Sequence, residues 1–222
     1  KKEEIKIRQC LGEAVPTAIF DSIADKIAFF FSKQHLVDAE VKKLIDTTDL
    51  SSLDSIIGYI SANFDTVGIS SISKVVEYAN AKREHNAAFF TDKSILNEIM
   101  KYLPDINKDV IHILEPSVGT GNFIPFVIKK YASAKSIIID VVDIDSSVIS
   151  VLKYIINKFN LPANITINFI NDDFLLHKFN THYDLVIGNP PFNKLSSNNS
   201  TLKLYKAQAV KTDKNKKFSF FF

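Results

Sequence analysis

The sequence predicts a doubly wound, mostly parallel α/β sheet that follows an N-terminal helical subdomain. From Asp109 onward, short β-branched runs alternate with amphipathic helical patterns, which is typical of parallel sheets with crossover helices. Residues 1–85 instead repeat apolar side chains at three- and four-residue spacing, the pattern of helices packed on a core. At 222 residues the chain has room for one domain with a small addition. We therefore predict a helical subdomain over 1–85 and an α/β domain over 86–222.

The helical subdomain contains four predicted helices and no recognisable chemistry. Apolar faces run through 19–31 and 36–45. Ser52 is suited to cap a third helix and Ser71 to open a fourth. Because stripes of this kind usually form a core, we assign these helices to packing.

The α/β region alternates four predicted strands with two clear helices. In such sheets ligands bind beyond the carboxyl ends of the strands, so the residues after each strand are the informative ones. The strands are predicted over Val110–Leu114, Ser136–Val142, Ile165–Ile170 and Tyr183–Ile187, and the helices over Phe123–Tyr131 and Ser146–Phe159.

Composition excludes several classes of protein. Cys10 is the single cysteine, so neither an internal disulfide nor a cysteine-based metal site can form, which suits a reducing cytoplasm. The longest uncharged runs reach about 13 residues, short of the about 20 that span a membrane. The histidines show no ligand spacing, and we expect no metal. The net charge of +2 makes no global case for nucleic acid, although 201–222 is rich in lysine.

The two ends of the sequence indicate a piece of a longer protein. The chain has no starting Met, and its last five residues, FSFFF, are an unusually apolar tail for a finished domain. We expect the α/β domain to be truncated at the C-terminus, without the later strands of its sheet.

The first predicted strand runs into a glycine turn, residues 115–123, EPSVGTGNF. Gly119 and Gly121 let the backbone turn tightly and approach a ligand closely. The Glu115 carboxylate can accept from an ammonium but would repel a pyrophosphate. That charge and the missing third glycine disfavour a nicotinamide dinucleotide. Alone, such a turn is also an ordinary strand–helix connection.

Acidic residues follow the second and third strands. Asp143 lies 22 residues after Gly121, near the interval at which an acidic side chain binds a ribose diol. Asp173 can accept from an adenine amino group while the Phe174 ring packs on the base. Acidic residues are common at strand ends, however, and Asp173 could equally cap a helix.

The fourth strand runs into residues 189–192, NPPF, which is the most specific pattern in the chain. Pro190 and Pro191 fix the backbone and hold Asn189 extended. The Asn189 side-chain oxygen and a neighbouring carbonyl then form two preorganised acceptors, beside the flat face of Phe192. This arrangement matches a planar amino group on a ring or an amide.

Residues 115–123 and 189–192 resemble the cofactor loop and catalytic motif of class I S-adenosylmethionine-dependent methyltransferases, a Rossmann-like family. More narrowly, they look like the DNA methyltransferases that modify adenine N6. The upstream segment 88–96 resembles the F-x-T-P stretch of their γ arrangement, with Asp92 where proline is usual. The resemblance covers roughly 88–192, nearly half of the chain.

The resemblance implies S-adenosylmethionine as the cofactor, lying across the strand ends. Its methionine part would lie near Thr91, Glu115 and Gly119, and its ribose near Asp143. The cofactor-binding residues implied are Phe90, Thr91, Glu115, Pro116, Gly119, Gly121, Phe123, Asp143, Ile144, Asp173 and Phe174. The catalytic residues implied are Asn189, Pro190, Pro191 and Phe192.

The resemblance also implies a mechanism and partners. The target adenine would be flipped out of double-stranded DNA and stacked on Phe192. Asn189 and the Pro190 carbonyl would accept the amino hydrogens during direct in-line methyl transfer. The chain would be the modification part of a restriction–modification system, fused to or paired with a restriction endonuclease or a specificity subunit, with no membrane partner.

Three alternatives stay open at this stage. One is a methyltransferase of protein glutamine, whose cofactor loop typically opens with Asp-Leu-Gly instead of the residues at 115–117. Another acts on an RNA amino group. The third is a non-catalytic DNA-binding subunit with the same fold, against which the intact motif at 189–192 argues. Cytosine N4 as the methylated atom is not excluded by that motif alone.

Overall fold

The computed structural model describes residues 36–80, 91, 93–159, 161–191 and 203–205. The helix predicted over 19–31 lies outside the described residues. The same holds for most of the lysine-rich end of the chain.

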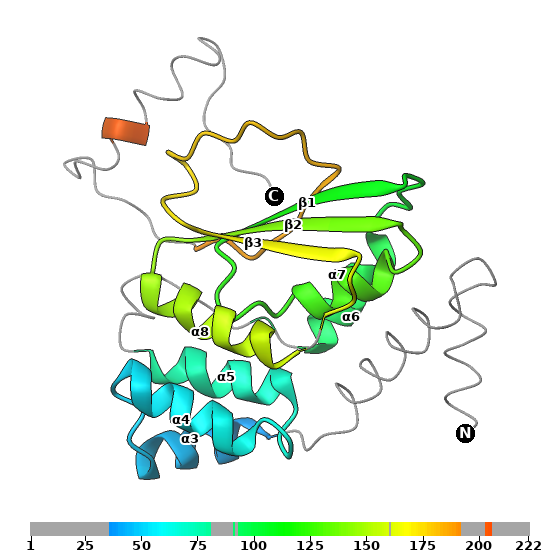
Figure 1. The fold of residues 1–222 in the computed structure, drawn as a ribbon. Helices are drawn as coiled ribbons and strands as arrows, with labels where there is room; N and C mark the ends of the chain where they lie inside the picture. The colour runs from blue at the N-terminus through cyan, green and yellow to red at the C-terminus, as the bar shows by residue number, and fades with distance from the viewer. Residues whose placement is uncertain (1–35, 81–90, 92, 160, 192–202, 206–222) are drawn as a thin grey trace, which may run out of the picture.

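The N-terminal helices form a compact layer with its own apolar core. The helical region, residues 36–80, contains α3 (Asp38–Thr47), α4 (Leu53–Asn63) and α5 (Ile69–Ala79). Their fully buried side chains meet Val151 and Ile155 of α8 (Ser146–Lys158). Figure 1 shows the three helices stacked beneath α8. The helical region is therefore packed directly on the α/β region.

Two helix starts predicted in this region have different outcomes. Ser52 is the N-cap of α4, and its hydroxyl accepts from the Ser55 amide at 3.1 Å, as predicted. The prediction for Ser71 is wrong, because α5 begins two residues earlier, with Gly68 as its N-cap. The Ser71 hydroxyl instead accepts from the Leu36 amide at 2.9 Å. The Ser71 hydroxyl is therefore bonded to a distant backbone amide and does not cap α5.

The α/β region is built on a four-stranded, all-parallel sheet in the order β3-β2-β1-β4. The chain runs outward from β1 through β2 to β3, then returns to the other side of β1. The strand order therefore reverses between β1 and β4, which is where such sheets bind ligands. The strands are β1 (Val110–Pro116), β2 (Ser136–Asp143), β3 (Ile165–Asn171) and β4 (Leu185–Val186), and the helices are α6 (Lys93–Tyr102), α7 (Ile124–Lys130) and α8.

The two faces of the sheet are covered differently. Helices α6, α7 and α8 lie on one face, and the chain between β3 and β4 passes over the other (Figure 1). Alternate β2 side chains, Ile137 and Ile139, face the helices in the main core. From the opposite face, Asp140 accepts a hydrogen bond from the Tyr183 hydroxyl. Helix α6, which the sequence pattern does not predict, buries Leu96 and packs Ile99 and Met100 against the same core.

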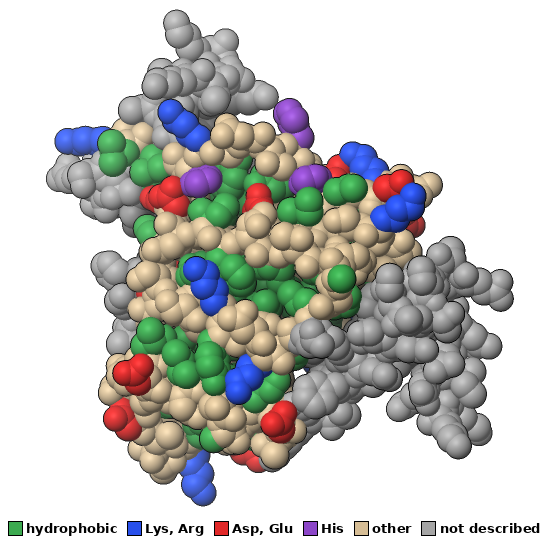
Figure 2. Space-filling view, in the orientation of Figure 1, with side chains coloured by type: hydrophobic (Ala, Val, Ile, Leu, Met, Phe, Trp, Pro, Cys, Tyr) green, Lys and Arg blue, Asp and Glu red, His purple; other side chains and the backbone are tan. Residues whose placement is uncertain are grey.

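The two ends of the strands differ in how they hold charge. At the amino ends, exposed ion pairs join Lys135 to Asp109 at 2.8 Å and Lys108 to Asp184. Figure 2 shows acidic and basic side chains side by side at the right-hand end of the view. At the carboxyl ends the Glu115 side chain is buried, 2% exposed. Burying a carboxylate costs free energy, and such groups are concentrated at functional sites. The carboxyl ends of the strands are therefore the candidate site.

Candidate functional site at the carboxyl ends of the strands

The turn after β1 has the unusual backbone that the glycines predict. Gly119 and Gly121 adopt φ values of 56° and 80°, and Ser117 adopts 55°. A Cβ on Gly121 would lie 2.6 Å from a Leu152 methyl of α8, so the loop packs closely against that helix. Positive φ in a residue other than glycine is uncommon and gathers at functional sites. The glycine loop, residues 117–122, is therefore held in a tight shape against α8.

Asp143, the last residue of β2, ties this loop to the next one. One carboxylate oxygen accepts from the Gly119 amide at 3.0 Å, and the other from the Asp145 amide at 2.9 Å. Burial raises the pKa of Asp143, although these hydrogen bonds oppose the shift. A carboxylate offers about four acceptor positions, so these bonds leave capacity for ribose hydroxyls.

Glu115, near the end of β1, is buried beneath the glycine loop. Its carboxylate accepts from the Phe123 amide, and burial raises its pKa well above the usual value. The neighbouring carboxylate of Glu77 adds to the same shift. A cation bound here would offset both effects.

The strand end at β4 lies directly against the end of β1. A Cβ on Gly188 would lie 2.6 Å from the Pro116 carbonyl oxygen, so only glycine fits at this separation. The next residue, Asn189, donates from its side-chain nitrogen to the Thr91 hydroxyl at 3.0 Å. Thr91 is 8% exposed. Two segments that are 98 residues apart are thereby joined beside the glycine loop.

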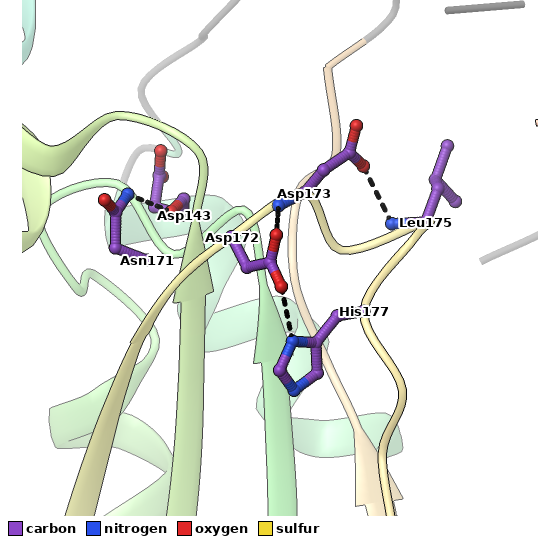
Figure 3. A network of polar contacts seen from close by, with 6 residues as sticks. All are labelled: Asp143, Asn171, Asp172, Asp173, Leu175 and His177. Atoms are coloured by element: carbon purple, nitrogen blue, oxygen red, sulfur yellow. Dashed lines mark hydrogen bonds and ion pairs between the residues drawn. The ribbon is translucent and has the colours of Figure 1, made fainter. Parts of the chain in front are cut away.

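The segment after β3 is organised by its own acidic residues (Figure 3). The Asn171 side chain donates to the Asp143 carbonyl at 2.9 Å, which links β3 to β2. Asp172 contacts the His177 ring at 2.7 Å. Asp173 accepts from the Leu175 amide at 3.0 Å and, through its other oxygen, from the Tyr205 hydroxyl at 2.7 Å. Burial and this contact raise the pKa of Tyr205 to about 12.

The remaining predicted site residues fall into three groups. Ile144 is 64% exposed at the end of β2, where an aliphatic side chain is free to cover a ligand. The Phe174 ring lies 5.8 Å from the Phe179 ring, and the Phe123 side chain is buried in the core. Phe90 and Phe192 lie outside the described residues.

Sequence reasoning missed three residues of this site. Glu77 of α5 accepts from the Thr120 hydroxyl at 2.6 Å, although 43 residues separate them. Gly188 was not singled out, yet a glycine between a strand and NPPF was the available signal. Tyr205 comes from a part of the chain to which no structure was assigned.

Taken together, the carboxyl ends of the strands bring together two carboxylates, Glu115 and Asp143, and the exposed aliphatic side chain of Ile144. Carboxylates can accept hydrogen bonds from cations or from hydroxyls, and an exposed aliphatic side chain can pack on a flat ring. Within the described part of the chain, no cluster of three His, Cys, Asp or Glu side chains could hold a metal ion. In that same part, no helix has the length and apolar character needed to span a bilayer.

Comparison with known proteins identifies the family. A family model described as N-6 DNA methylase matches residues 74–222, about two thirds of the chain, so the chain belongs to this family. The cofactor is therefore S-adenosylmethionine. A sequence search of curated proteins finds no match.

Solved structures with similar folds are distant from this chain. One, described as a class I S-adenosylmethionine-dependent methyltransferase from Listeria monocytogenes, is 16% identical over 82% of this chain, with a TM-score of 0.44. The plantazolicin methyltransferase BpumL, solved with S-adenosylhomocysteine, is 19% identical over 77% of this chain, with a TM-score of 0.28. YjhP from E. coli is 15% identical over 54%, with a TM-score of 0.34. The chain spans 60%, 50% and 42% of these three structures, respectively.

Proposed function

We propose that this member of the N-6 DNA methylase family transfers a methyl group from S-adenosylmethionine to the N6 amino group of adenine in double-stranded DNA. The observation that carries the proposal is the position of Asn189. It directly follows Gly188 at the point where the strand order reverses, and its amide is oriented by Thr91. An amide held there is placed to receive an amino group beside the cofactor loop.

Each residue of the site has a part in this proposal. Bound S-adenosylmethionine supplies an electrophilic methyl group on a sulfonium. Glu115 accepts from the cationic methionine end and Asp143 from the ribose hydroxyls, while Ile144 covers the adenine ring. The Asn189 nitrogen is turned toward Thr91, so its oxygen is the end of the amide that serves as acceptor.

Asn189 and the Pro190 carbonyl act on the target amino group. Both accept hydrogen bonds from its N–H groups and direct its lone pair toward the methyl group, and one of these protons is released after the transfer. Positive charge grows on that nitrogen during transfer, so both hydrogen bonds strengthen in the transition state, as catalysis requires. Phe192 stacks on the flipped base, which compensates part of its lost stacking in the duplex.

The identity of the methylated atom is the decisive test. The chain is incubated with S-adenosylmethionine and DNA from a methylation-free strain, and the nucleosides are analysed by mass spectrometry. We expect N6-methyladenine from the parent and far less of it from Asn189→Ala after the same incubation time. N4-methylcytosine would overturn the choice of base, and label transferred only to RNA or to protein glutamine would overturn DNA as the substrate.

We further propose that this activity is the modification step of a restriction–modification system. Such a step must protect every copy of one recognition site, so methylation should be confined to a single sequence. Sequencing DNA from cells that express the chain tests this directly. Methylated adenines scattered without a shared sequence would contradict it.

A further inference from the structure

The carboxylate of Glu77 reaches the glycine loop from the helical region. Its Oε1 atom accepts from the Thr120 hydroxyl at 2.6 Å, from the Asn122 amide group at 3.2 Å and from the Thr120 backbone amide at 3.4 Å. Thr120 is 3% exposed. One oxygen atom therefore gathers donors from two residues of the loop in a largely buried place.

The carboxylate also lies over the most constrained part of the loop. A Cβ added to Gly119 would lie 3.1 Å from the same Oε1 atom. The Gly119 amide is held from the other side by Asp143 at 3.0 Å. The loop is thus fixed between β2 and α5, and residues from two regions of the chain set its shape.

The position of Glu77 in its own helix does not explain why an acidic residue is there. Glu77 lies in the last turn of α5, which ends at Ala79. The negative end of the helix dipole disfavours an acidic side chain in that turn. Its benefit must therefore come from outside the helix, and the described contacts with Thr120 and Asn122 supply it. Hydrogen bonds to a charged acceptor are shorter and stronger than neutral ones.

We propose that Glu77 is a positioning residue that fixes the glycine loop for the cofactor and so makes cofactor binding depend on the helical region. The inference rests on the proposed function only for its cofactor, since it needs no particular methyl acceptor. When α5 is seated, Glu77 holds Thr120 and Asn122 and keeps the turn at Gly119 in its receiving shape. When that contact is lost, part of the free energy of cofactor binding is used to order the loop.

Calorimetric titration of the whole chain with S-adenosylmethionine tests the inference without DNA. We expect Glu77→Ala to raise Kd by about tenfold to a hundredfold, because it removes a charged acceptor of several hydrogen bonds. Glu77→Gln keeps an acceptor oxygen but not its charge, and should recover part of the loss. Asp38→Ala is the matched control. It removes a carboxylate of α3 that pairs with Lys74, which lies in α5 like Glu77 but away from the loop. Its Kd should equal that of the parent.

A variant on the loop side keeps the test decisive if Glu77→Ala folds poorly. Thr120→Val removes the shortest of the hydrogen bonds and should reproduce part of the rise in Kd. Adding Glu77→Gln to Thr120→Val should then weaken binding by less than the two single effects together. In turnover with DNA, Glu77→Ala and Thr120→Val should each raise KM for the cofactor and leave kcat at saturating cofactor nearly unchanged.

Several outcomes would overturn the inference. Parental affinity in folded Glu77→Ala would remove the positioning role. Equal losses of cofactor affinity in Glu77→Ala and Asp38→Ala would mean general loosening of the helical region. Equal losses in Glu77→Ala and Glu77→Gln would mean that the charge of Glu77, and not its hydrogen bonds to the loop, determines binding. A parent that binds the cofactor but methylates no DNA would overturn the proposed function alone.

Discussion

The helical region and the carboxyl ends of the strands bury polar groups in different ways. Between residues 36 and 80, the buried polar groups of the side chains are the hydroxyls of Ser71, Ser73 and Tyr59, all neutral. Around the strand ends the buried polar groups include the carboxylates of Glu115 and Asp145. Burying a neutral hydroxyl costs little once it is hydrogen-bonded, whereas burying a carboxylate costs far more, and burial raises the pKa of Glu115. The helical region is built for packing. The carboxyl ends of the strands bury carboxylates, and recognition of a ligand offsets the free energy that this burial costs.

The largest expected effect separates chemistry from packing. Asn189→Ala should lower the rate of methyl transfer by about 10²–10³, because it removes one preorganised acceptor that acts in the transition state. Single-turnover measurements at saturating cofactor and DNA give this rate. The Kd for the cofactor should change far less than this rate, although the Thr91 hydroxyl loses its hydrogen bond from Asn189.

A matched asparagine in the helical region sharpens this prediction. Asn63 of α4 also uses its amide nitrogen, donating to the Tyr59 carbonyl at 2.8 Å. Asn63→Ala should leave the transfer rate unchanged and affect only stability. A comparable loss of rate in both variants would mean that the loss does not report chemistry at Asn189.

The next effect tests how closely β4 and β1 must approach. Gly188→Ala would place a Cβ 2.6 Å from the Pro116 carbonyl oxygen, so the two strand ends must move apart. We expect it to destabilise the fold by about 1–3 kcal/mol, as overpacking does. Transfer should also slow, since Asn189 follows directly. Urea denaturation and single-turnover rates measure the two effects, and a variant as stable and as fast as the parent would refute the close approach.

A smaller effect concerns the pH dependence of stability. Burial raises the pKa of Glu115 above its usual value of 4.5, so the folded chain holds this proton at pH values where the unfolded chain has lost it. The contribution of Glu115 to stability is therefore full below about pH 4.5 and decreases as the pH rises toward the shifted pKa. Glu115→Gln, which cannot ionise, should remove this decrease.

Urea denaturation of the parent and Glu115→Gln between pH 4 and pH 8 measures the difference. The stability of the parent relative to the variant should fall as the pH rises. Asp143 has a raised pKa of the same sign, but it is present in both proteins and cancels in the comparison. Parallel profiles would mean that burial does not shift the pKa of Glu115.

Much of the fold follows from local patterns in the sequence. The β-branched runs place β1, β2 and β3 within one or two residues, because each strand pairs along its whole length in the sheet. Helix α8 begins at the predicted residue. The strand at β4 is shorter than predicted, Leu185–Val186, since it pairs with β1 over two residues only. A continuous β-branched run indicates a strand that is buried on both faces, and this pattern can be read from each segment alone.

The missed features depend on contacts between distant residues. Glu77 looks like a solvent-facing charge in α5, and only its bonds to Thr120 and Asn122 reveal another role. Ser71 looks like a helix cap, until Leu36 is brought to its hydroxyl. Glycines are recognised in a motif such as G-x-G, whereas Gly188 is required only because a second strand end lies against it. Local spacing carries no information on these pairings.

The smallest effect has the opposite sign and tests the other half of the comparison. Gly58 lies inside α4, is exposed, and has no atom within 4 Å of an added Cβ. Gly58→Ala should therefore stabilise the chain by about 0.5–1 kcal/mol, because alanine loses less backbone entropy in a helix. Urea denaturation should show this gain with an unchanged transfer rate, where Gly188→Ala shows losses in both. A loss of stability would mean that the outer face of α4 is covered by another part of the molecule. A changed transfer rate would mean that the helical region reaches the chemistry by a route other than Glu77, and the division between a packing region and a ligand region would then fail.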